Sequence, residues 1–257
     1  MTDAETAVYV YGVVPASDQT VIEAKGVGRE DTDVRRVTQD AIAALVSDLS
    51  PGALVATRDL RAHWSVLEEA AARTTVLPVR FGTVMENDEA VKDDFLRPDS
   101  ERLAAVLAGL EGKVQLSIKG FYDEELLLRQ IVQEKPGIAR MRERVQGLPE
   151  AASYYDRISL GELVAAEVDQ CRARDAELVL GRLEPLAEAA RAEQPTAKHG
   201  ALDTAFLVRR DRVDAFSAAV QQLAAELGDR VRIRYVGPLP PYSFAENDAD
   251  LASAAWA

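Results

Sequence analysis

The most constraining segment of this 257-residue chain lies near its C-terminus, where residues 237–244 read Gly-Pro-Leu-Pro-Pro-Tyr-Ser-Phe. Three prolines within four positions can neither continue a helix nor donate hydrogen bonds to a sheet, so the segment is a stiff, extended turn. Such a turn has little conformational entropy left to lose on docking. We expect a plug over the end of its own domain, or else a recognition segment, with these candidate contact residues: Pro240, Pro241, Tyr242 and Phe244.

The charge balance narrows the range of partners. The chain has 30 Lys and Arg residues against 43 Asp and Glu residues, a net charge of −13, which disfavours general binding to nucleic acid or to an anionic membrane. A single cysteine, Cys171, excludes an internal disulfide and is typical of a reducing compartment. The N-terminus lacks a signal-peptide pattern, and no apolar stretch approaches the roughly 20 residues that cross a bilayer. We therefore expect a cytoplasmic protein.

The first half of the chain mixes strand and helix patterns. Residues 7–14 are β-branched or aromatic on both alternating faces, which predicts a central strand covered on both sides. The further patterns predict, in chain order, strands over 33–38, 41–48 and 76–84 and helices over 58–74, 88–96 and 100–110. We expect an N-terminal, mixed α/β-rich domain over residues 1–110.

The second half is mainly helical between strands. A cleanly alternating strand covers 113–119, and helical patterns fill 123–193, with a long amphipathic helix from Ser159 and a break near Gly181 and Pro185. A strand–helix–strand run ends the domain, over 201–208, 211–227 and 230–236, and fits half of a ferredoxin-like βαββαβ unit. The predicted fold class is α+β with two domains, the second being ferredoxin-like with added helices over 111–244 and followed by a flexible tail, 245–257.

No pattern of catalytic residues stands out. The two histidines, His63 and His199, share no local signature with Cys171, and we interpret them as surface or packing residues and the thiol as buried and inert. Residues 26–28 read Gly-Val-Gly but lack the third glycine of a dinucleotide fingerprint. The sequence contains no Walker A, HExxH, GxSxG or zinc-ligand pattern. We expect no catalytic residue, no cofactor, no metal site and no small-molecule substrate.

Alternating arginines mark the last predicted strand. Arg230, Arg232 and Arg234 alternate with apolar residues, so their guanidinium groups are expected to line one face of the strand. Two interpretations remain open: a solvated face whose arginines pair with acidic side chains, or a contact for an acidic partner involving Arg232 and Arg234.

A second distinctive run is LPVRFGTV at residues 77–84. Pro78 within a strand requires an edge or strand-start position. Arg80 is flanked by Val79 and Phe81, which suggests a charge held against the protein. Arg80 and Phe81 therefore join the candidate structural or partner-contact residues.

These two runs, 77–84 and VGPLPPYSF at 236–244, resemble the hallmark segments of the gas vesicle accessory proteins of the GvpL/GvpF family. The resemblance extends to the strand at 8–14, to the helix containing His63 and to the last strand–helix–strand unit, and so covers about residues 7–244. Leu239 is a departure, because the family more often has an aromatic residue between the prolines. The motifs do not separate the F type from the L type, and we favour the L type slightly.

The resemblance implies a non-enzymatic role. It implies two α+β domains, the second ferredoxin-like, in a protein that binds the small hydrophobic main shell protein of the gas vesicle and other accessory proteins, to support nucleation or to prevent aggregation. The implied location is cytoplasmic and gas vesicle-associated. Two alternatives remain: a ferredoxin-like regulatory module that binds a small ligand between domains, and an enzyme that uses scattered carboxylates.

Overall fold

Two units make up the chain in the computed structural model, which describes residues 7–28, 32–50, 55–149, 152–197 and 199–245. Unit 1 combines residues 1–115 with residues 237–257, and unit 2 comprises residues 116–236. The Pro-rich segment, which we expected in the C-terminal domain, therefore groups with the N-terminal part of the chain. Of the expected tail, Ala245 is buried and the rest lies outside the described residues.

The sheet of unit 1 is antiparallel, with the order β2-β3-β1-β4, and β5 also pairs with β1. A two-residue turn at Asp40 joins β2 to β3, and Asp40 adopts a φ of 52°, a left-handed conformation that aspartate tolerates. The strands are β1 (Val8–Pro15), β2 (Arg35–Gln39), β3 (Ile42–Asp48), β4 (Leu77–Pro78) and β5 (Val84–Met85). Pro78 lies in an edge strand, as its missing N–H requires.

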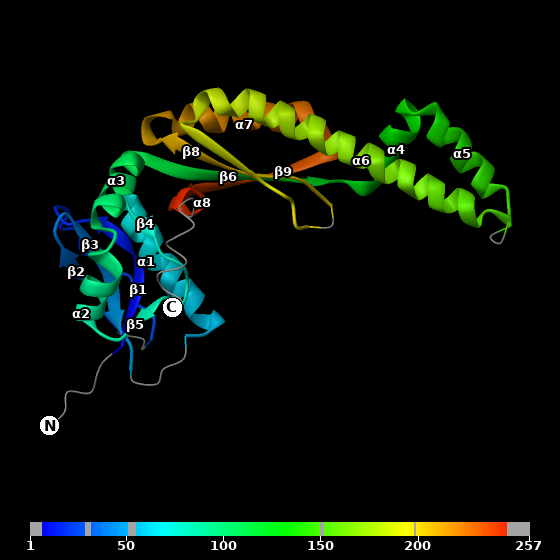
Figure 1. Ribbon diagram of the computed structural model, residues 1–257. Helices are drawn as coiled ribbons and strands as arrows, with labels where there is room; N and C mark the ends of the chain where they lie inside the picture. Colours follow the sequence, from blue (N-terminus) through cyan, green and yellow to red (C-terminus); the bar gives the residue numbers. More distant parts are fainter. Residues whose placement is uncertain (1–6, 29–31, 51–54, 150–151, 198, 246–257) are drawn as a thin grey trace. The chain divides into compact units, whose positions relative to one another are not determined.

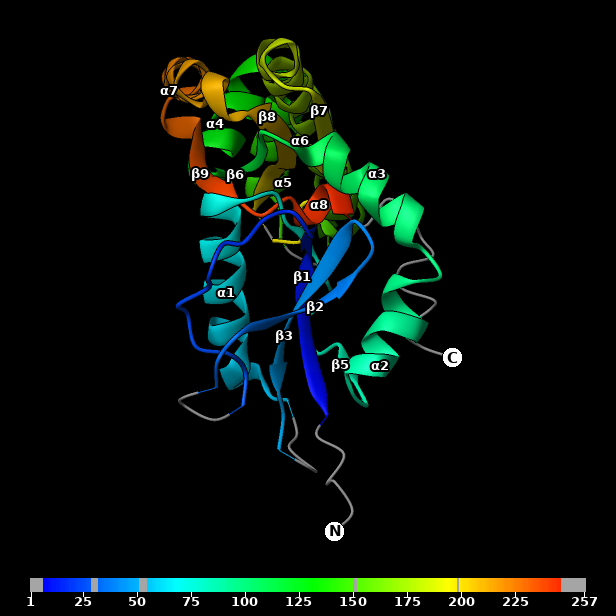
Figure 2. The same ribbon diagram turned by 90° about the vertical axis from the view of Figure 1, so that its left-hand side faces the viewer.

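Helices cover both faces of this sheet (Figure 2). One face carries α1 (Leu60–Arg73), and the other carries α2 (Asp88–Ala90), the short π-helix η2 (Val91–Leu96) and α3 (Ser100–Leu110). Residues 8–14 of β1 are all buried, which confirms the prediction of a central strand covered on both sides. The prediction of a single strand over residues 76–84 is wrong, because a turn separates β4 from β5.

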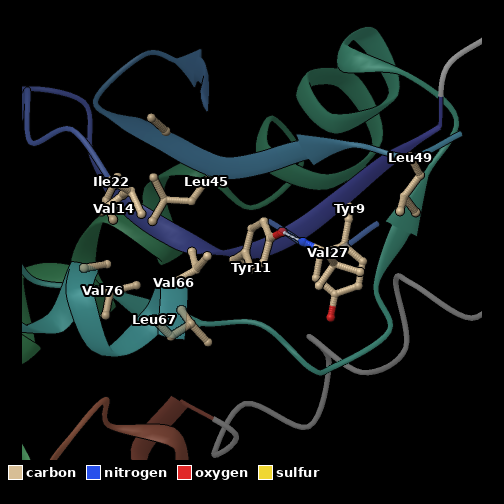
Figure 3. Packing of buried hydrophobic residues seen from close by; sticks show 12 residues of the cluster. Tyr9, Tyr11, Val14, Ile22, Val27, Leu45, Leu49, Val66, Leu67 and Val76 are labelled. Carbon is tan, nitrogen blue, oxygen red and sulfur yellow. Dashed lines mark hydrogen bonds between the residues drawn. The ribbon is translucent and has the colours of Figure 1, made fainter. Parts of the chain in front are cut away.

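The core between β1 and α1 contains two tyrosines among aliphatic side chains (Figure 3). The Tyr11 hydroxyl lies 2.7 Å from Ser47 Oγ and accepts a hydrogen bond from the Val27 N–H. Burial of an unpaired hydroxyl costs about 1–3 kcal/mol, so these bonds allow Tyr11 to be fully buried. They also hold the loop that contains Val27 against the sheet.

The sheet of unit 2 has the order β7-β8-β6-β9. Its strands are β6 (Lys113–Tyr122), β7 (Ala189–Glu193), β8 (Gly200–Arg209) and β9 (Val231–Leu239). The Tyr122 N–H donates to His199 O, and the Asp123 N–H donates to Arg230 O, so the end of β6 lies beside the starts of β8 and β9. Both pairings are therefore antiparallel, as is the pairing of β7 with β8. We expected helix at 189–193, whose Ala and Glu residues favour helix, but pairing with β8 overrides that preference.

The helices of unit 2 are α4 (Glu124–Glu134), α5 (Pro136–Gln146), α6 (Tyr154–Leu183) and α7 (Val213–Leu227). The predicted start of α6 at Ser159 is wrong: the helix begins after Ser153 and runs without a break through Gly181. Pro185 lies just beyond, in a 3-10 turn, where its missing N–H breaks no helical hydrogen bond.

Figure 1 shows α6 and α7 along one face of the sheet, while α4, α5 and the first half of α6 extend beyond it. We call residues 124–164 the helical arm. Within the described part of the chain, no helix has the length and apolarity that a membrane crossing requires.

Candidate functional site

His63 joins three distant parts of unit 1. Helix α1 directs it toward β1, where its Nδ1 lies 2.9 Å from the hydroxyl of Tyr9. Its Nε2 lies 2.9 Å from the hydroxyl of Tyr242, in the short helix α8 (Tyr242–Ala245). The imidazole is only 1% exposed. The chain thus bonds its first strand, its first long helix and its C-terminal segment to one side chain, and we call Tyr9, His63, Phe81 and Tyr242 the His63 cluster.

Burial keeps the titratable side chains of this cluster neutral. Burial lowers the pKa of His63 from 6.5 to about 4, so the ring is neutral at pH 7. Burial also raises the pKa of the Tyr9 and Tyr242 hydroxyls, which remain protonated. The Tyr9 oxygen accepts the Gly82 N–H at 3.0 Å and is also hydrogen-bonded to His63 Nδ1. The neutral imidazole has one nitrogen that donates and one that accepts, so each ring nitrogen has a hydroxyl partner.

The turn between β4 and β5 completes the cluster. Gly82 has a φ of 93°, in a region that favours glycine. In this conformation its N–H donates a hydrogen bond to the Tyr9 hydroxyl. The preceding Phe81 packs edge-on to His63 with ring centroids 5.5 Å apart, and lies 6.3 Å from the Tyr9 ring. Arg80 is the first residue of the turn and is exposed. We expected its charge to be held against the protein, and the structure instead places it at the surface.

The Pro-rich segment packs on the N-terminal core. Pro240 and Pro241 are buried, the Tyr242 ring lies 4.8 Å from that of Trp64, and the Ser243 N–H donates to Gln115 Oε1 at 2.9 Å. Phe244 is half-buried in α8. The segment is thus packed as a plug, but over the core of unit 1. The expectation that it covers the end of its own C-terminal domain is corrected, because the partners of Tyr242 lie on α1.

The His63 cluster is suited to holding structure together. Its histidine is neutral and enclosed between two hydroxyls whose protons are difficult to remove, so this cluster presents no activated nucleophile to solvent. Among the described residues, no group of three or more His, Cys, Asp or Glu side chains could hold a metal ion.

Substitution of Tyr242 by phenylalanine tests this role. The variant keeps the ring packing on Trp64 but leaves His63 Nε2 without its hydrogen-bond partner, and we expect the free energy of unfolding to fall by about 1–2 kcal/mol. Urea denaturation followed by circular dichroism measures the change. Tyr155→Phe, at an 81% exposed position, is the matched control and should leave stability unchanged. Equal midpoints for the two variants would contradict the bond.

The arginine stripe is shorter than expected. Arg232 and Arg234 are exposed on β9, but Arg230 precedes the strand and forms a two-point ion pair with Asp175 of α6, at 2.6 and 2.7 Å. The Tyr122 hydroxyl donates to the same carboxylate at 2.5 Å. The prediction that three arginines share one strand face is therefore wrong for Arg230, since the strand starts one residue later.

A second surface lies on the helical arm. Of the nine large apolar side chains that are exposed among the described residues, six lie between residues 128 and 163. Tyr154 and Tyr155, at the start of α6, are 59% and 81% exposed. The six are Leu128, Leu148, Tyr154, Tyr155, Ile158 and Leu163.

Some residues of the His63 cluster and of the Asp175 contacts were not predicted from the sequence. Tyr9 and the Asp175–Tyr122 bond were not identified as parts of a site. The available signal was the placement of two tyrosines, Tyr9 and Tyr11, within a fully apolar strand, because buried hydroxyls need hydrogen-bond partners. No comparable pattern marks Asp175, which lies in a long helix with many acidic residues.

Comparison with known proteins shows that the chain is similar to one protein family in both sequence and fold. Residues 7–246 match the family described as "Gas vesicle synthesis protein GvpL/GvpF". Gas vesicle protein F of Streptomyces sp. (strain CB03234) is 37% identical over 243 residues, covering 93% of this chain and 99% of that protein. The crystal structure of GvpF from Anabaena sp. PCC7120 superposes with a TM-score of 0.81 at 27% identity, covering 93% of this chain and 98% of that one.

The comparisons also distinguish the two types within the family. Gas vesicle protein L of the same Streptomyces strain is 28% identical over 201 residues, covering 72% of this chain and 68% of that protein. The relative named protein F matches more of the chain at higher identity. The preference for the L type is therefore corrected in favour of the F type.

Proposed function

Because the chain belongs to the GvpL/GvpF family of gas vesicle synthesis proteins, we propose that it binds the main shell protein of the gas vesicle and other accessory proteins during assembly. The family is one of gas vesicle accessory proteins and not of enzymes, and its role lies in gas vesicle synthesis. By covering the apolar surfaces of shell subunits, the protein supports nucleation or prevents aggregation. It acts in the cytoplasm, in association with the growing vesicle.

The observation that carries this proposal is the exposed apolar surface of the helical arm. A small hydrophobic subunit aggregates unless its apolar faces and strand edges are covered before it enters the shell. Tyr154 and Tyr155 offer large contact area at low entropic cost, with ring centroids 5.4 Å apart. An acidic chain that carries such a surface stays dispersed through its net charge of −13 while it holds an apolar partner.

The order of elements in unit 2 supports a ferredoxin-like arrangement. The unit runs strand, helices, two strands, helix and strand, and the first strand, β6, pairs with both the third and the fourth. This arrangement leaves β9 at an edge, where Arg232 and Arg234 are exposed and are candidate contacts for an acidic partner.

The other candidate residues divide by their burial. Phe81, Pro240, Pro241, Tyr242 and Phe244 are buried or half-buried in unit 1, which supports a structural role in holding the C-terminal segment. Arg80 lies exposed beside this group and is the candidate for partner contact.

Capture of the shell subunit tests the proposal. We expect the purified protein to co-elute with the shell protein and to suppress its aggregation, measured by light scattering. The double variant Tyr154→Ser/Tyr155→Ser should lose about tenfold or more in capture without a change in thermal unfolding, because both rings are exposed.

Val21→Ser provides the matched control, since Val21 is 71% exposed but lies in unit 1. Unchanged capture by the tyrosine variant would remove the arm from the proposal. Failure of the native protein to co-elute with the shell protein and to alter its aggregation would refute the function itself.

A further inference from the structure

The helical arm contains a groove with apolar walls. It lies among α4, α5 and α6 and has a volume of about 750 Å³. Two of its apolar residues, Ile138 and Val145, are buried on α5, and the others are partly open to solvent. The apolar lining consists of Leu128, Val132, Ile138, Val145, Leu160 and Val164.

The groove carries positive charge in an acidic chain. Arg129, Arg142 and Arg157 line it, against a single carboxylate, that of Glu125. Glu125 pairs with Arg129 at 2.5 Å, and Arg157 Nε donates to Ser153 Oγ at 3.0 Å. Three guanidinium groups beside an apolar floor favour an occupant that combines apolar and acidic side chains.

A glycine in the middle of α6 leaves room at this groove. Gly161 costs about 1 kcal/mol of helix stability relative to alanine, yet a Cβ at this position would meet no atom within 4 Å. The packing of the unit therefore does not require glycine here. Because Gly161 lines the groove, the space that it leaves open is available for close approach by another backbone.

We propose that this groove binds an amphipathic α-helix of a partner protein, whose apolar stripe is flanked by acidic side chains. The inference rests on the proposed function, since it names the chemistry of one partner in vesicle assembly. A groove walled by three helices suits the helix-in-groove mode, in which residues spaced three and four apart enter an apolar channel. The arginines then pair with carboxylates on both sides of the stripe and select against basic helices.

The probe is a pair of designed, fluorescently labelled helical peptides of about 18 residues, or five turns. Both carry the same leucine stripe, flanked by glutamate in one peptide and by lysine in the other. Fluorescence anisotropy with the full chain is expected to show at least about tenfold tighter binding of the glutamate peptide, and this preference should weaken as salt increases.

Gly161→Leu fills the groove, and Gly181→Leu is the matched control. Both glycines lie in α6 with open space where a Cβ would stand, but Gly181 does not line the groove. We expect Gly161→Leu to weaken binding of the glutamate peptide about tenfold or more and Gly181→Leu to leave it unchanged, with equal thermal unfolding of the two variants.

Equal affinities for the two peptides, or for the two leucine variants, would overturn the inference. A second contradicting result would come from phosphatidylserine vesicles. If Gly161→Leu lost binding to these vesicles but kept binding to the glutamate peptide, the occupant of the groove would be a lipid surface. Shell-protein capture is a separate measurement: if it persists while the peptide fails to bind, the groove inference fails and the proposed function stands.

Discussion

Replacement of Arg230 by alanine is expected to lower the free energy of unfolding by about 3–5 kcal/mol. The change leaves the Asp175 carboxylate, only 6% exposed, without the two-point guanidinium contact that balances its charge. The hydroxyl of Tyr122 still donates to this carboxylate, but one neutral donor does not replace a cation. Urea denaturation of the purified variant measures the loss.

Arg232→Ala is the control for this prediction, because Arg232 lies two residues away on the same chain segment and is exposed. Its free energy of unfolding should change by no more than about 0.5 kcal/mol. Combining Arg230→Ala with Asp175→Ala should restore part of the lost stability, since the uncompensated charge is then gone. Equal small effects of Arg230→Ala and Arg232→Ala would show that the ion pair contributes nothing.

Acidification from about pH 6.5 to about pH 4 is expected to destabilise the protein through His63. The unfolded chain binds a proton at the ordinary histidine pKa of 6.5, whereas burial holds the pKa of the folded imidazole at about 4. The unfolded state therefore carries more protons within this window, and stability falls as pH falls. The stability that depends on neutral His63 is fully present above about pH 6.5, and about 3 kcal/mol of it is lost as the pH falls to about 4.

His63→Gln isolates this effect. The glutamine amide offers one donor and one acceptor to the hydroxyls of Tyr9 and Tyr242 but does not titrate. The difference in unfolding free energy between the native protein and this variant should depend on pH only below about 6.5. His199→Gln, at the half-buried second histidine, is the comparison variant. A native-like acid response in His63→Gln would assign the effect to carboxylates instead.

The two surfaces of the protein are suited to different tasks. The His63 cluster uses buried, neutral groups to hold the C-terminal segment against α1 and β1, so its variants should change stability first. The helical arm presents apolar side chains that α4, α5 and α6 do not bury among themselves, so its variants should change partner capture with little effect on stability.

The sequence by itself determined those features that depend on neighbours along the chain. The apolar run of β1 predicted a strand covered on both faces, and the alternation of β9 predicted exposed Arg232 and Arg234. Side-chain period follows directly from backbone geometry, which is why these elements were predictable. The two motifs of residues 77–84 and 236–244 likewise identified the family that the comparisons show.

Only the tertiary structure decided which distant residues meet. The hydrogen bond between His63 and Tyr242 joins residues that are 179 positions apart. No local sequence pattern predicts that the Pro-rich segment packs on the first long helix and not on the C-terminal domain. Arg230 was predicted to share a strand face with Arg232 and Arg234, but it precedes β9 and pairs with the buried Asp175 of α6. Strand β7 formed against its own helical propensity because β8 offered an edge with which to pair. Propensities amount to fractions of a kcal/mol per residue, and burial and pairing between remote segments outweigh them.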